Sequence, residues 1–258
     1  MSVLHENPIF QRALALRDSG KFAESLQELD SLLQTQIDNV GRSIIQYGRV
    51  QCLIALNRIA EAKSSLEEAE LLSGPAPVGL LELEWAFIAV QEGQYDTATR
   101  LFRSIFERYA DEIASEDYRD LNWKALHAFG QSLAHTGAYT EAIKVLEKAI
   151  SLSDTPTTRY AVFSELGEAH FYLGNIDQAR QCFANAVKEE LSVPESIRTA
   201  HSRSHLRYWC AYAAYAQGDF NTAKRELAAA AAIAPPENAH LIKSIHTLRG
   251  LLEPWPRA

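Results

Sequence analysis

Small and large apolar residues recur along this chain at helical spacing, in segments joined in pairs by short polar turns. Ala142, Leu146 and Ala149 stand at steps of four and three, and the same steps recur from Ala179 to Ala186. Residues at these steps share one face of an α-helix. The pattern therefore predicts amphipathic helices that pack in pairs through that face.

The first residue of each predicted turn is one that readily adopts the left-handed backbone conformation. Glycine adopts it without steric cost and asparagine is the usual substitute, so either can end the first helix of a pair. Polar residues three positions later are predicted to cap the second helix through their side chains. The turn residues are Gly20, Asn57, Gly93, Gly137, Gly174 and Gly218. The predicted caps are Asp96, Thr140, Asp177 and Asn221.

The turns divide the chain into repeats of similar length. Successive turn residues lie 37, 36, 44, 37 and 44 positions apart. Repetition at such a period predicts stacked helical hairpins, each burying its core against its neighbours and leaving other surface for binding. The two longer intervals contain 109–121 and 189–203, which are predicted to be either extended helices or ordered loops.

Prolines are predicted to lie between the hairpins, because proline interrupts the interior of a helix. Beyond the last of them, a helix is predicted over 238–252 as the solvating cap of the array, followed by a frayed tail at 253–258. The prolines are Pro75, Pro77, Pro156, Pro194, Pro235 and Pro236. The apolar face of the predicted cap consists of Leu241, Ile245, Leu248 and Leu252.

The order and spacing of residues around the fifth turn resemble those of the tetratricopeptide repeat family. The residues that carry the resemblance are Phe163, Leu166, Gly167, Gly174, Ile176, Ala179, Phe183 and Ala186. The resemblance extends over about 8–235, although every interval between turns exceeds the family's period of about 34 residues. It implies an all-α fold, a right-handed superhelical solenoid of antiparallel helix pairs.

The resemblance also implies a single array over residues 1–258, with six repeats and a capping helix. The repeats are expected at about 6–38, 43–73, 79–109, 121–153, 159–191 and 203–235, and the capping helix at 238–252.

The composition is that of a folded, acidic protein. Of its 258 residues, 47% are apolar and 22% are charged, and the net charge is −8. Nonspecific nucleic-acid binding is therefore not expected, although residues 195–258 are slightly basic. No apolar run approaches the length of a membrane span, and Cys52, Cys182 and Cys210 are too scattered for a disulfide framework or a zinc ribbon. We expect a soluble cytoplasmic protein that does not associate with a membrane.

In arrays of this family, the first helix of each hairpin lines the concave surface, which is the expected binding groove. The candidate partner-binding residues on that surface are Tyr47, Gln51, Phe87, Lys124, His127, Gln131, Glu168, Phe171, His205, Tyr208, Tyr212 and Tyr215. The same face is expected to include Phe10, Leu14, Leu83 and Ser164. Some family members clamp the C-terminal carboxylate of a chaperone tail with basic residues and asparagines. Only Lys124 supplies a suitable cation here, so that ligand is not expected.

Three tyrosines form the strongest local signal for binding. Tyr208, Tyr212 and Tyr215 stand at i, i+4 and i+7, so one helix face carries three rings with polar tips. Rings of this kind can anchor a peptide or a helix, but they can equally pack against the next hairpin. Both interpretations remain open at this point.

A basic stretch lies over 198–207. His201 and His205 are four residues apart and could share a metal ion, but the arginines around them oppose a cation, so no metal site is expected. A solvated basic stripe is favoured, with an acidic peptide or a phosphate as the alternative ligand. The acidic segment 111–120 is expected to be solvated, or to meet the basic stretch of a second copy in self-association.

The sequence contains no phosphate-binding loop, nucleophile elbow or zinc-protease motif. We therefore expect no catalytic residues, no cofactor and no enzymatic activity. The first hypothesis is a scaffold that binds a peptide or a partner helix of unknown identity in its groove. The alternative is a regulatory module that responds to a ligand or peptide and controls a partner protein. RNA binding is disfavoured by Glu84, Glu165 and Glu168, because it needs a basic face.

Overall fold

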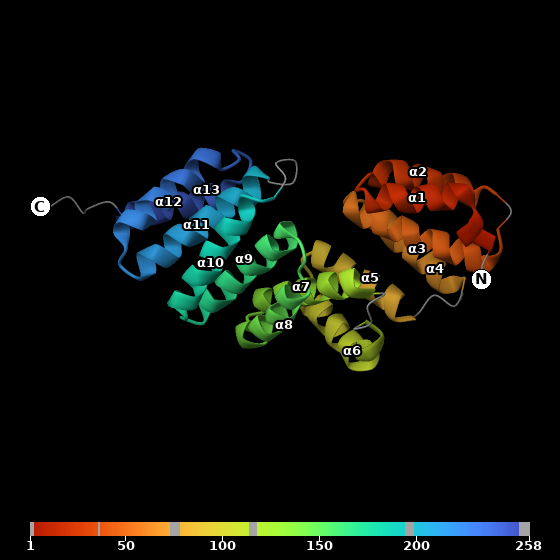
Figure 1. Ribbon diagram of the computed structural model, residues 1–258, viewed down its shortest axis with the longest axis horizontal. Helices are drawn as coiled ribbons and strands as arrows, with labels where there is room; N and C mark the ends of the chain where they lie inside the picture. The colour runs from red at the N-terminus through yellow and green to blue at the C-terminus, as the bar shows by residue number, and fades with distance from the viewer. Residues whose placement is uncertain (1–2, 36, 73–77, 114–117, 194–198, 253–258) are drawn as a thin grey trace, which may run out of the picture. The chain divides into compact units, whose positions relative to one another are not determined.

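The computed structural model describes residues 3–35, 37–72, 78–113, 118–193 and 199–252 (Figure 1). These residues form α-helices, one short 3₁₀ helix and the turns between them, with no strand. The helices are η1 (Val3–Glu6), α1 (Pro8–Asp18), α2 (Phe22–Leu33), α3 (Asn39–Ala55), α4 (Ile59–Leu71), α5 (Val78–Gln91), α6 (Tyr95–Ile113), α7 (Arg119–His135), α8 (Tyr139–Ser151), α9 (Pro156–Tyr172), α10 (Ile176–Glu190), α11 (Ala200–Ala216), α12 (Phe220–Ile233) and α13 (Ala239–Leu252).

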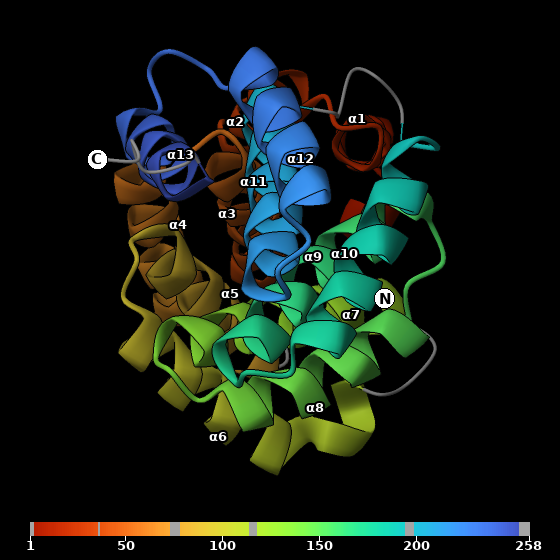
Figure 2. The same ribbon diagram turned by 90° about the vertical axis from the view of Figure 1, so that its left-hand side faces the viewer.

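The helices belong to two compact units, Met1–Tyr118 and Arg119–Ala258. Unit 1 contains the hairpins α1/α2, α3/α4 and α5/α6, and unit 2 contains α7/α8, α9/α10 and α11/α12. In unit 2, α13 packs against α12 and α11 (Figure 2). The all-α prediction of antiparallel helix pairs is confirmed, whereas the single array with its six stated repeats stays a prediction.

The six predicted turn residues all adopt the left-handed conformation. Asn57 has a φ of 57°, and the five glycines have φ values between 70° and 81°. The prediction of the second-helix caps is wrong, because each of these helices begins two residues earlier than that prediction requires. Ala138 and Asn175 are the N-cap residues of α8 and α10 and make no side-chain cap, whereas Asp219 accepts a hydrogen bond from the amide of Thr222. Thr140, Asp177, Asn221 and Asp96 instead lie inside the first turns of their helices.

The two helices of a hairpin approach each other closely, because small residues of the first helix lie opposite large residues of the second helix. Gly130 lies against Leu146 and Gly167 lies against Phe183, with no space for a side chain between them. The residue nine positions after the turn is buried in each of the six described hairpins; these residues are Leu29, Leu66, Phe102, Leu146, Phe183 and Leu227. The steps of four and three thus mark the face of the second helix that packs on the first.

Two alanines in this face test the register. Ala142 and Ala179 are both fully buried, so neither site has room for a larger side chain. Ala142→Leu and Ala179→Leu are each expected to lower the free energy of unfolding by about 1 to 3 kcal/mol through overpacking. Urea denaturation followed by circular dichroism measures the change. Unchanged stability in both variants would show that the face is assigned incorrectly.

The breaks between hairpins agree with the proline prediction where the structure describes them. Pro156 is the first residue of α9, behind a capping box in which Thr155 and Thr158 exchange hydrogen bonds. Pro235 and Pro236 lie between α12 and α13. Pro75, Pro77, Pro194 and the tail at 253–258 lie outside the described residues.

Part of each long interval is helical. In the first, α6 continues to Ile113 through a non-helical residue at Tyr109, and α7 begins at Arg119. In the second, α10 ends at Glu190 and α11 begins at Ala200. Residues 114–117 and 194–198 lie outside the described part of the chain. The structure therefore distinguishes helix from loop only for the residues on either side of these two segments. The predicted capping helix is present as α13, with its four predicted apolar residues buried.

Candidate functional site

The first helices of successive hairpins in unit 2 lie beside one another, with α9 in contact with both α7 and α11 (Figure 1). Polar side chains connect the three helices. Gln131 of α7 donates a hydrogen bond to Glu165 of α9 at 3.4 Å, and His205 of α11 approaches Glu168 of α9 at 3.5 Å. We call this surface the unit 2 groove face; it comprises Gln131, Glu165, Glu168, Phe171, His205, Tyr208 and Tyr212.

Glu165 and Glu168 are one turn apart on α9, and their environment disfavours their charges. Burial raises the pKa of Glu165 to about 7, although the hydrogen bond from Gln131 lowers it. Burial and the nearby charge of Glu165 raise the pKa of Glu168 well above its usual range. The Glu168 side chain is still 21% exposed, so a ligand on this face can reach it.

The orientation of His205 follows from its two neighbours. Its Nε2 accepts a hydrogen bond from the indole Nε1 of Trp209 at 3.3 Å. In the neutral ring the proton is therefore on Nδ1, the atom that faces Glu168. The group of α11 that faces Glu168 is thus the Nδ1–H of His205, a hydrogen-bond donor that carries no permanent positive charge.

Aromatic rings continue the groove face beyond the carboxylates. The ring of Phe171 lies 4.9 Å from that of Tyr212 and 5.4 Å from that of Trp209, and Tyr208 lies 6.0 Å from Tyr212. Trp209 is buried at the centre of this cluster and also stacks on Phe183 in the core. The cluster therefore connects the hairpin core to the surface.

The three predicted tyrosines are partly buried and pack on the core beneath α11. Tyr212 stacks on Tyr215 at 6.4 Å, and Tyr215 contacts Phe220 of α12 at 6.0 Å. Tyr215 is therefore directed toward α12, whereas Tyr212 lies against Phe171 of α9 and Tyr208 forms a hydrogen bond with Ser244 of α13. The tyrosines contribute to packing, and their remaining exposure keeps the binding hypothesis open for them.

The other predicted residues of α7 have different environments. Lys124 is exposed, whereas His127 stacks on Trp123 with ring centroids 5.4 Å apart. Burial lowers the pKa of His127 to about 4, so its ring is neutral at physiological pH. Neither its Nε2 nor the Nε1 of Trp123 has a hydrogen-bond partner in the described part of the protein.

In unit 1, the predicted Tyr47 and Gln51 belong to a polar network between first helices. Gln51 donates hydrogen bonds to the Tyr47 hydroxyl at 2.9 Å and to Glu84 at 3.1 Å, and it accepts one from Arg17 at 2.8 Å. Burial and the neighbouring Glu84 raise the pKa of Tyr47 far above its usual value. Glu84 is only 3% exposed, so this network lies within the fold.

The remaining apolar candidates of the first helices include core residues. Phe10 is 2% exposed and Leu83 is 1% exposed, so their expected place on an open groove is wrong. Leu14 is partly buried against the core of unit 1, and Phe87 packs edge-on against Phe102 at 5.7 Å. Ser164 bonds to the Tyr160 carbonyl within its own helix. Helical spacing alone could not separate the two faces of these helices.

The described arginines of the predicted basic stripe form ion pairs within the protein. Arg203 bonds to Glu190 at 2.8 Å, and Arg207 pairs with Glu190 at 3.5 Å and with Glu226 at 3.0 Å. Because these arginines are held by carboxylates of α10 and α12, they are not free for an acidic ligand. The side chain of His201 and residue Arg198 lie outside the described set, as do the side chains of 111–117. The described residues contain no cluster of three metal-ligating side chains.

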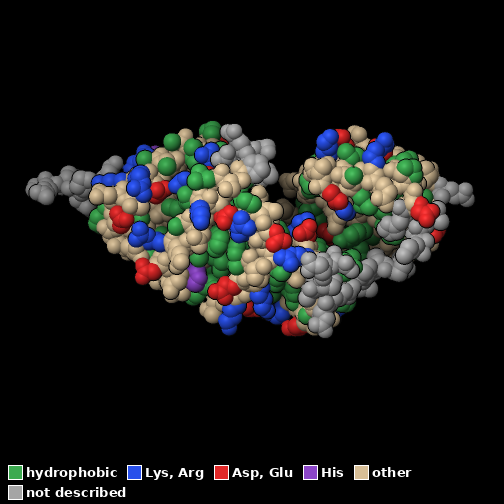
Figure 3. All heavy atoms as spheres, in the orientation of Figure 1, with side chains coloured by type: hydrophobic (Ala, Val, Ile, Leu, Met, Phe, Trp, Pro, Cys, Tyr) green, Lys and Arg blue, Asp and Glu red, His purple; other side chains and the backbone are tan. Residues whose placement is uncertain are grey.

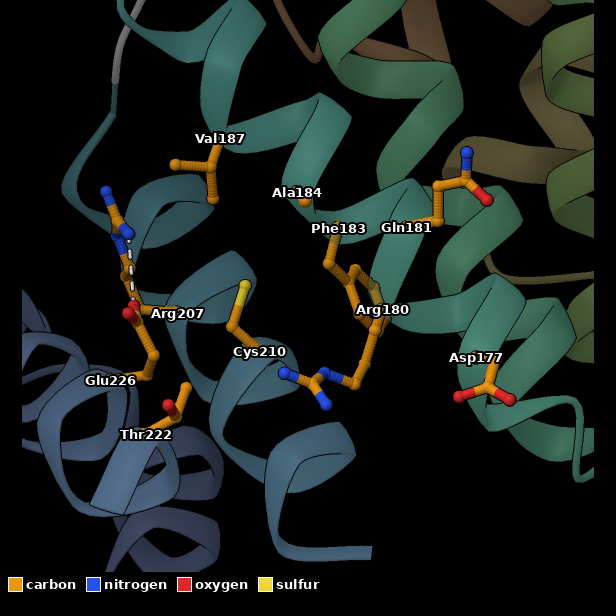
Figure 4. Close-up of a pocket in the computed structure, with 10 residues that line it drawn as sticks. All are labelled: Asp177, Arg180, Gln181, Phe183, Ala184, Val187, Arg207, Cys210, Thr222 and Glu226. Atoms are coloured by element: carbon orange, nitrogen blue, oxygen red, sulfur yellow. Dashed lines mark hydrogen bonds and ion pairs between the residues drawn. The ribbon is translucent and has the colours of Figure 1, made fainter. Parts of the chain in front are cut away.

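A cleft of about 550 Å³ lies on α10, α11 and α12 (Figure 4). Arg180 reaches into it, and the ion pair between Arg207 and Glu226 forms part of its wall. Burial raises the pKa of Cys210 in this wall to about 12, so the thiol is protonated at neutral pH and is a poor nucleophile. The cleft therefore offers a surface of mixed polar and apolar side chains, and its thiol is not activated.

The surface in Figure 3 shows basic and acidic side chains interspersed among hydrophobic ones. Several of these charges form ion pairs between neighbouring helices, such as that between Arg108 and Glu82 at 2.5 Å. Sequence analysis missed Trp209 and Tyr172 as members of the aromatic cluster, and it weighed Glu165 only against RNA binding. The signal for Glu165 was present, because it stands three residues before the predicted Glu168 on one helix face.

Comparisons with known proteins agree with this architecture. Residues 124–156 and 164–239 each match a family model described as tetratricopeptide repeat. TPR repeat-containing protein MJ1428 of Methanocaldococcus jannaschii is 26% identical over 117 residues, which cover 45% of this chain and 19% of that protein. The chain thus matches about a fifth of the length of this relative.

Solved structures share the fold at low sequence identity. The apo form of the quorum sensor NprR from B. thuringiensis aligns with a TM-score of 0.68 and 15% identity, over 94% of this chain and 69% of that one. YrrB, described as a TPR protein with an unusual peptide-binding site, aligns with a TM-score of 0.54 and 17% identity, over 80% and 92%.

No helix in the described ranges is both long enough and apolar enough to cross a membrane. Tetratricopeptide repeats in general serve as scaffolds for protein–protein interaction. The antiparallel helix pairs, the left-handed turn residues and the two family matches agree, and the chain belongs to the tetratricopeptide repeat family.

Proposed function

We propose that this protein is a non-catalytic scaffold that binds an extended peptide or a partner helix on the unit 2 groove face. The observation that supports this most directly is the combination of partly exposed rings and a partly exposed carboxylate on adjacent first helices. Tyr208 and Tyr212 present partly exposed rings, and Glu168 presents a partly exposed carboxylate beside them. Aromatic residues of this type commonly anchor protein partners.

Rigid support favours binding on this face. Trp209 and Phe183 hold the aromatic cluster from below, so its rings lose little conformational freedom when a partner binds. YrrB shows by its description that the fold can accommodate a peptide. We also propose a cytoplasmic location, because the scattered cysteines suit a reducing compartment.

A regulatory role is the second hypothesis. It is motivated by NprR, which has the same fold and is described as a quorum sensor. Under this hypothesis, the peptide that binds the groove face would also change the affinity of the protein for a second partner. Titration of that partner with and without the peptide distinguishes a regulator from a scaffold, because only a regulator couples the two affinities.

The test of groove binding is a pull-down from native lysate with mass-spectrometric identification. We expect the variant Tyr208→Ala, Tyr212→Ala, Tyr215→Ala to lose at least one protein that the wild type retains, because its anchoring rings are absent. Leu191→Ala is the control, since Leu191 is 73% exposed and lies away from the rings at the end of α10. Circular dichroism and thermal melting establish that the triple variant remains folded. Identical profiles from the folded triple variant and the wild type would contradict the proposal.

A further inference from the structure

The two carboxylates of the groove face, Glu165 and Glu168, have no lysine or arginine partner in the described part of the chain. Their described contacts are Gln131, which is neutral, and His205, whose Nδ1 is 3.5 Å from Glu168. Other carboxylates of unit 2 are arranged differently, because Glu190 has two arginines and Glu189 pairs with Arg159.

This arrangement disfavours the charged form of both groups in the absence of a ligand. Burial acts against each charge, and the charge of Glu165 acts against that of Glu168. A single cation placed between the two would relieve both effects at once. The groove face therefore carries negative charge that no lysine or arginine of the described residues neutralises, and a positively charged group of the partner would neutralise it.

The surroundings favour an organic cation on a side chain. Phe171 and Tyr172 follow the carboxylates on the same face of α9, and Tyr212 lies 4.9 Å from Phe171. Aromatic faces attract lysine and arginine head groups and cover their apolar stems. A small metal ion is less favoured, because the described residues contain no group of three side chains that could hold one.

A second observation on the adjacent helix also indicates a missing partner. His127 stands one turn before Gln131 on α7, and its buried Nε2 has no hydrogen-bond partner within the described ranges. Burial keeps this ring neutral, so it does not repel a cation on the groove face. A buried polar atom without a partner is uncommon in a folded protein, and a bound ligand is one means of satisfying it.

We propose that the unit 2 groove face recognises a basic residue of its partner peptide, with the lysine or arginine head group held between Glu165 and Glu168 and its stem against the aromatic rings. This inference rests on the proposed function, since it specifies the chemistry of the peptide bound there. It differs from the carboxylate clamp of the family in the sign of the charge that is recognised.

The test is a selection of random dodecapeptides displayed on phage against the full-length protein. The variant Glu165→Gln, Glu168→Gln removes both charges and keeps the shape and hydrogen-bonding ability of the side chains. A matched control, Glu147→Gln, Glu237→Gln, removes two exposed charges of the same unit. Thermal melting checks that both variants are folded, and the groove variant is expected to be at least as stable as the wild type because it no longer buries like charges.

Peptides selected by the wild type and by the control are expected to share a lysine or arginine at one position, and the groove variant should lose that preference. Replacement of this residue by norleucine should weaken binding to the wild type about tenfold or more, with little effect on the groove variant. Peptides selected without a basic residue, or with the same preference in all three proteins, would overturn the inference but leave groove binding intact. Selection of no peptide by the wild type would contradict both this inference and the proposed function.

The pH dependence supplies an independent readout with the same peptide. Binding of a cation favours the ionised carboxylates, so affinity should fall as the pH is lowered from 8 to 6, through the pKa of about 7 of Glu165. Of the titratable groups facing the pair, His205 on α11 would add a repelling charge if protonated, whereas Tyr172 on α9 stays neutral over this range. Fluorescence anisotropy of the labelled peptide measures the change. Affinity that is constant over this range would exclude the buried pair as the site of the cation.

Discussion

Gly167→Ala is expected to lower the free energy of unfolding by about 1 to 3 kcal/mol, although alanine favours helices more than glycine does. A Cβ at this position would lie 2.4 Å from Cε1 and 2.6 Å from Cδ1 of Phe183. The ring cannot move away freely, since Phe183 is 1% exposed and stacks on Trp209. The two helices of the hairpin would therefore have to separate. Urea denaturation followed by circular dichroism measures the loss.

Two further variants distinguish overpacking at position 167 from the effect that replacing glycine by alanine has in any helix. Gly250→Ala is the matched control, because Gly250 lies in α13 with no atom within 4 Å of the added carbon, so stability should stay equal or rise. Adding Phe183→Leu to Gly167→Ala reproduces the buried pair found in the last hairpin, Ala211 with Leu227, and should recover part of the loss. Equal stability of Gly167→Ala and the wild type would contradict the close approach of α9 and α10.

Trp209→Ala is expected to cost about 3 to 5 kcal/mol, the range for removing a large buried aromatic side chain. Trp209 is 7% exposed, and its ring is within 6.3 Å of those of Phe171, Tyr172 and Phe183. Its loss opens a cavity in the centre of the cluster and leaves the Nε2 of His205 without its donor. The same denaturation experiment measures the cost.

Trp209→Phe separates the packing of the ring from its hydrogen bond. Phenylalanine keeps most of the apolar contact and removes the Nε1 donor, so the loss should be smaller than for alanine and include about 1 kcal/mol for the hydrogen bond. Leu191→Ala, at a 73% exposed site, should change stability by less than about 0.5 kcal/mol. If Trp209→Ala were as mild as Leu191→Ala, Trp209 could not be the support of the groove face.

The groove residues could be predicted only in part from the sequence. The spacing of Tyr208 and Tyr212 placed them on the first helix of a hairpin, where Tyr212 is found against Phe171 of α9. The same spacing placed Phe10 and Leu83 on an open surface, although both are buried in the core of unit 1. Periodicity identifies residues that share a helix face, but it does not report which neighbour covers that face.

The cap prediction was wrong for a local reason. The residue three positions after the turn glycine is polar in four hairpins, as a cap should be, yet the second helix starts two positions after the glycine. The Asn175 cap position makes no side-chain cap, because the tight turn fixes the start of the helix by its backbone bonds. Capping preferences therefore did not set these helix boundaries, whereas the left-handed turn residues did.

The sequence by itself determined the helix pairs, their turns and the buried register, because these depend on residues that are near one another along the chain. The turn conformation is a property of Gly174 or Asn57, and the small-to-large contact between Gly167 and Phe183 spans a single hairpin. Only the tertiary structure decided the chemistry of the groove face. Glu165 meets Gln131 from 34 positions away, and Glu168 meets His205 from the next hairpin, so burial, charge and pKa at this site are set by the packing of hairpins on one another.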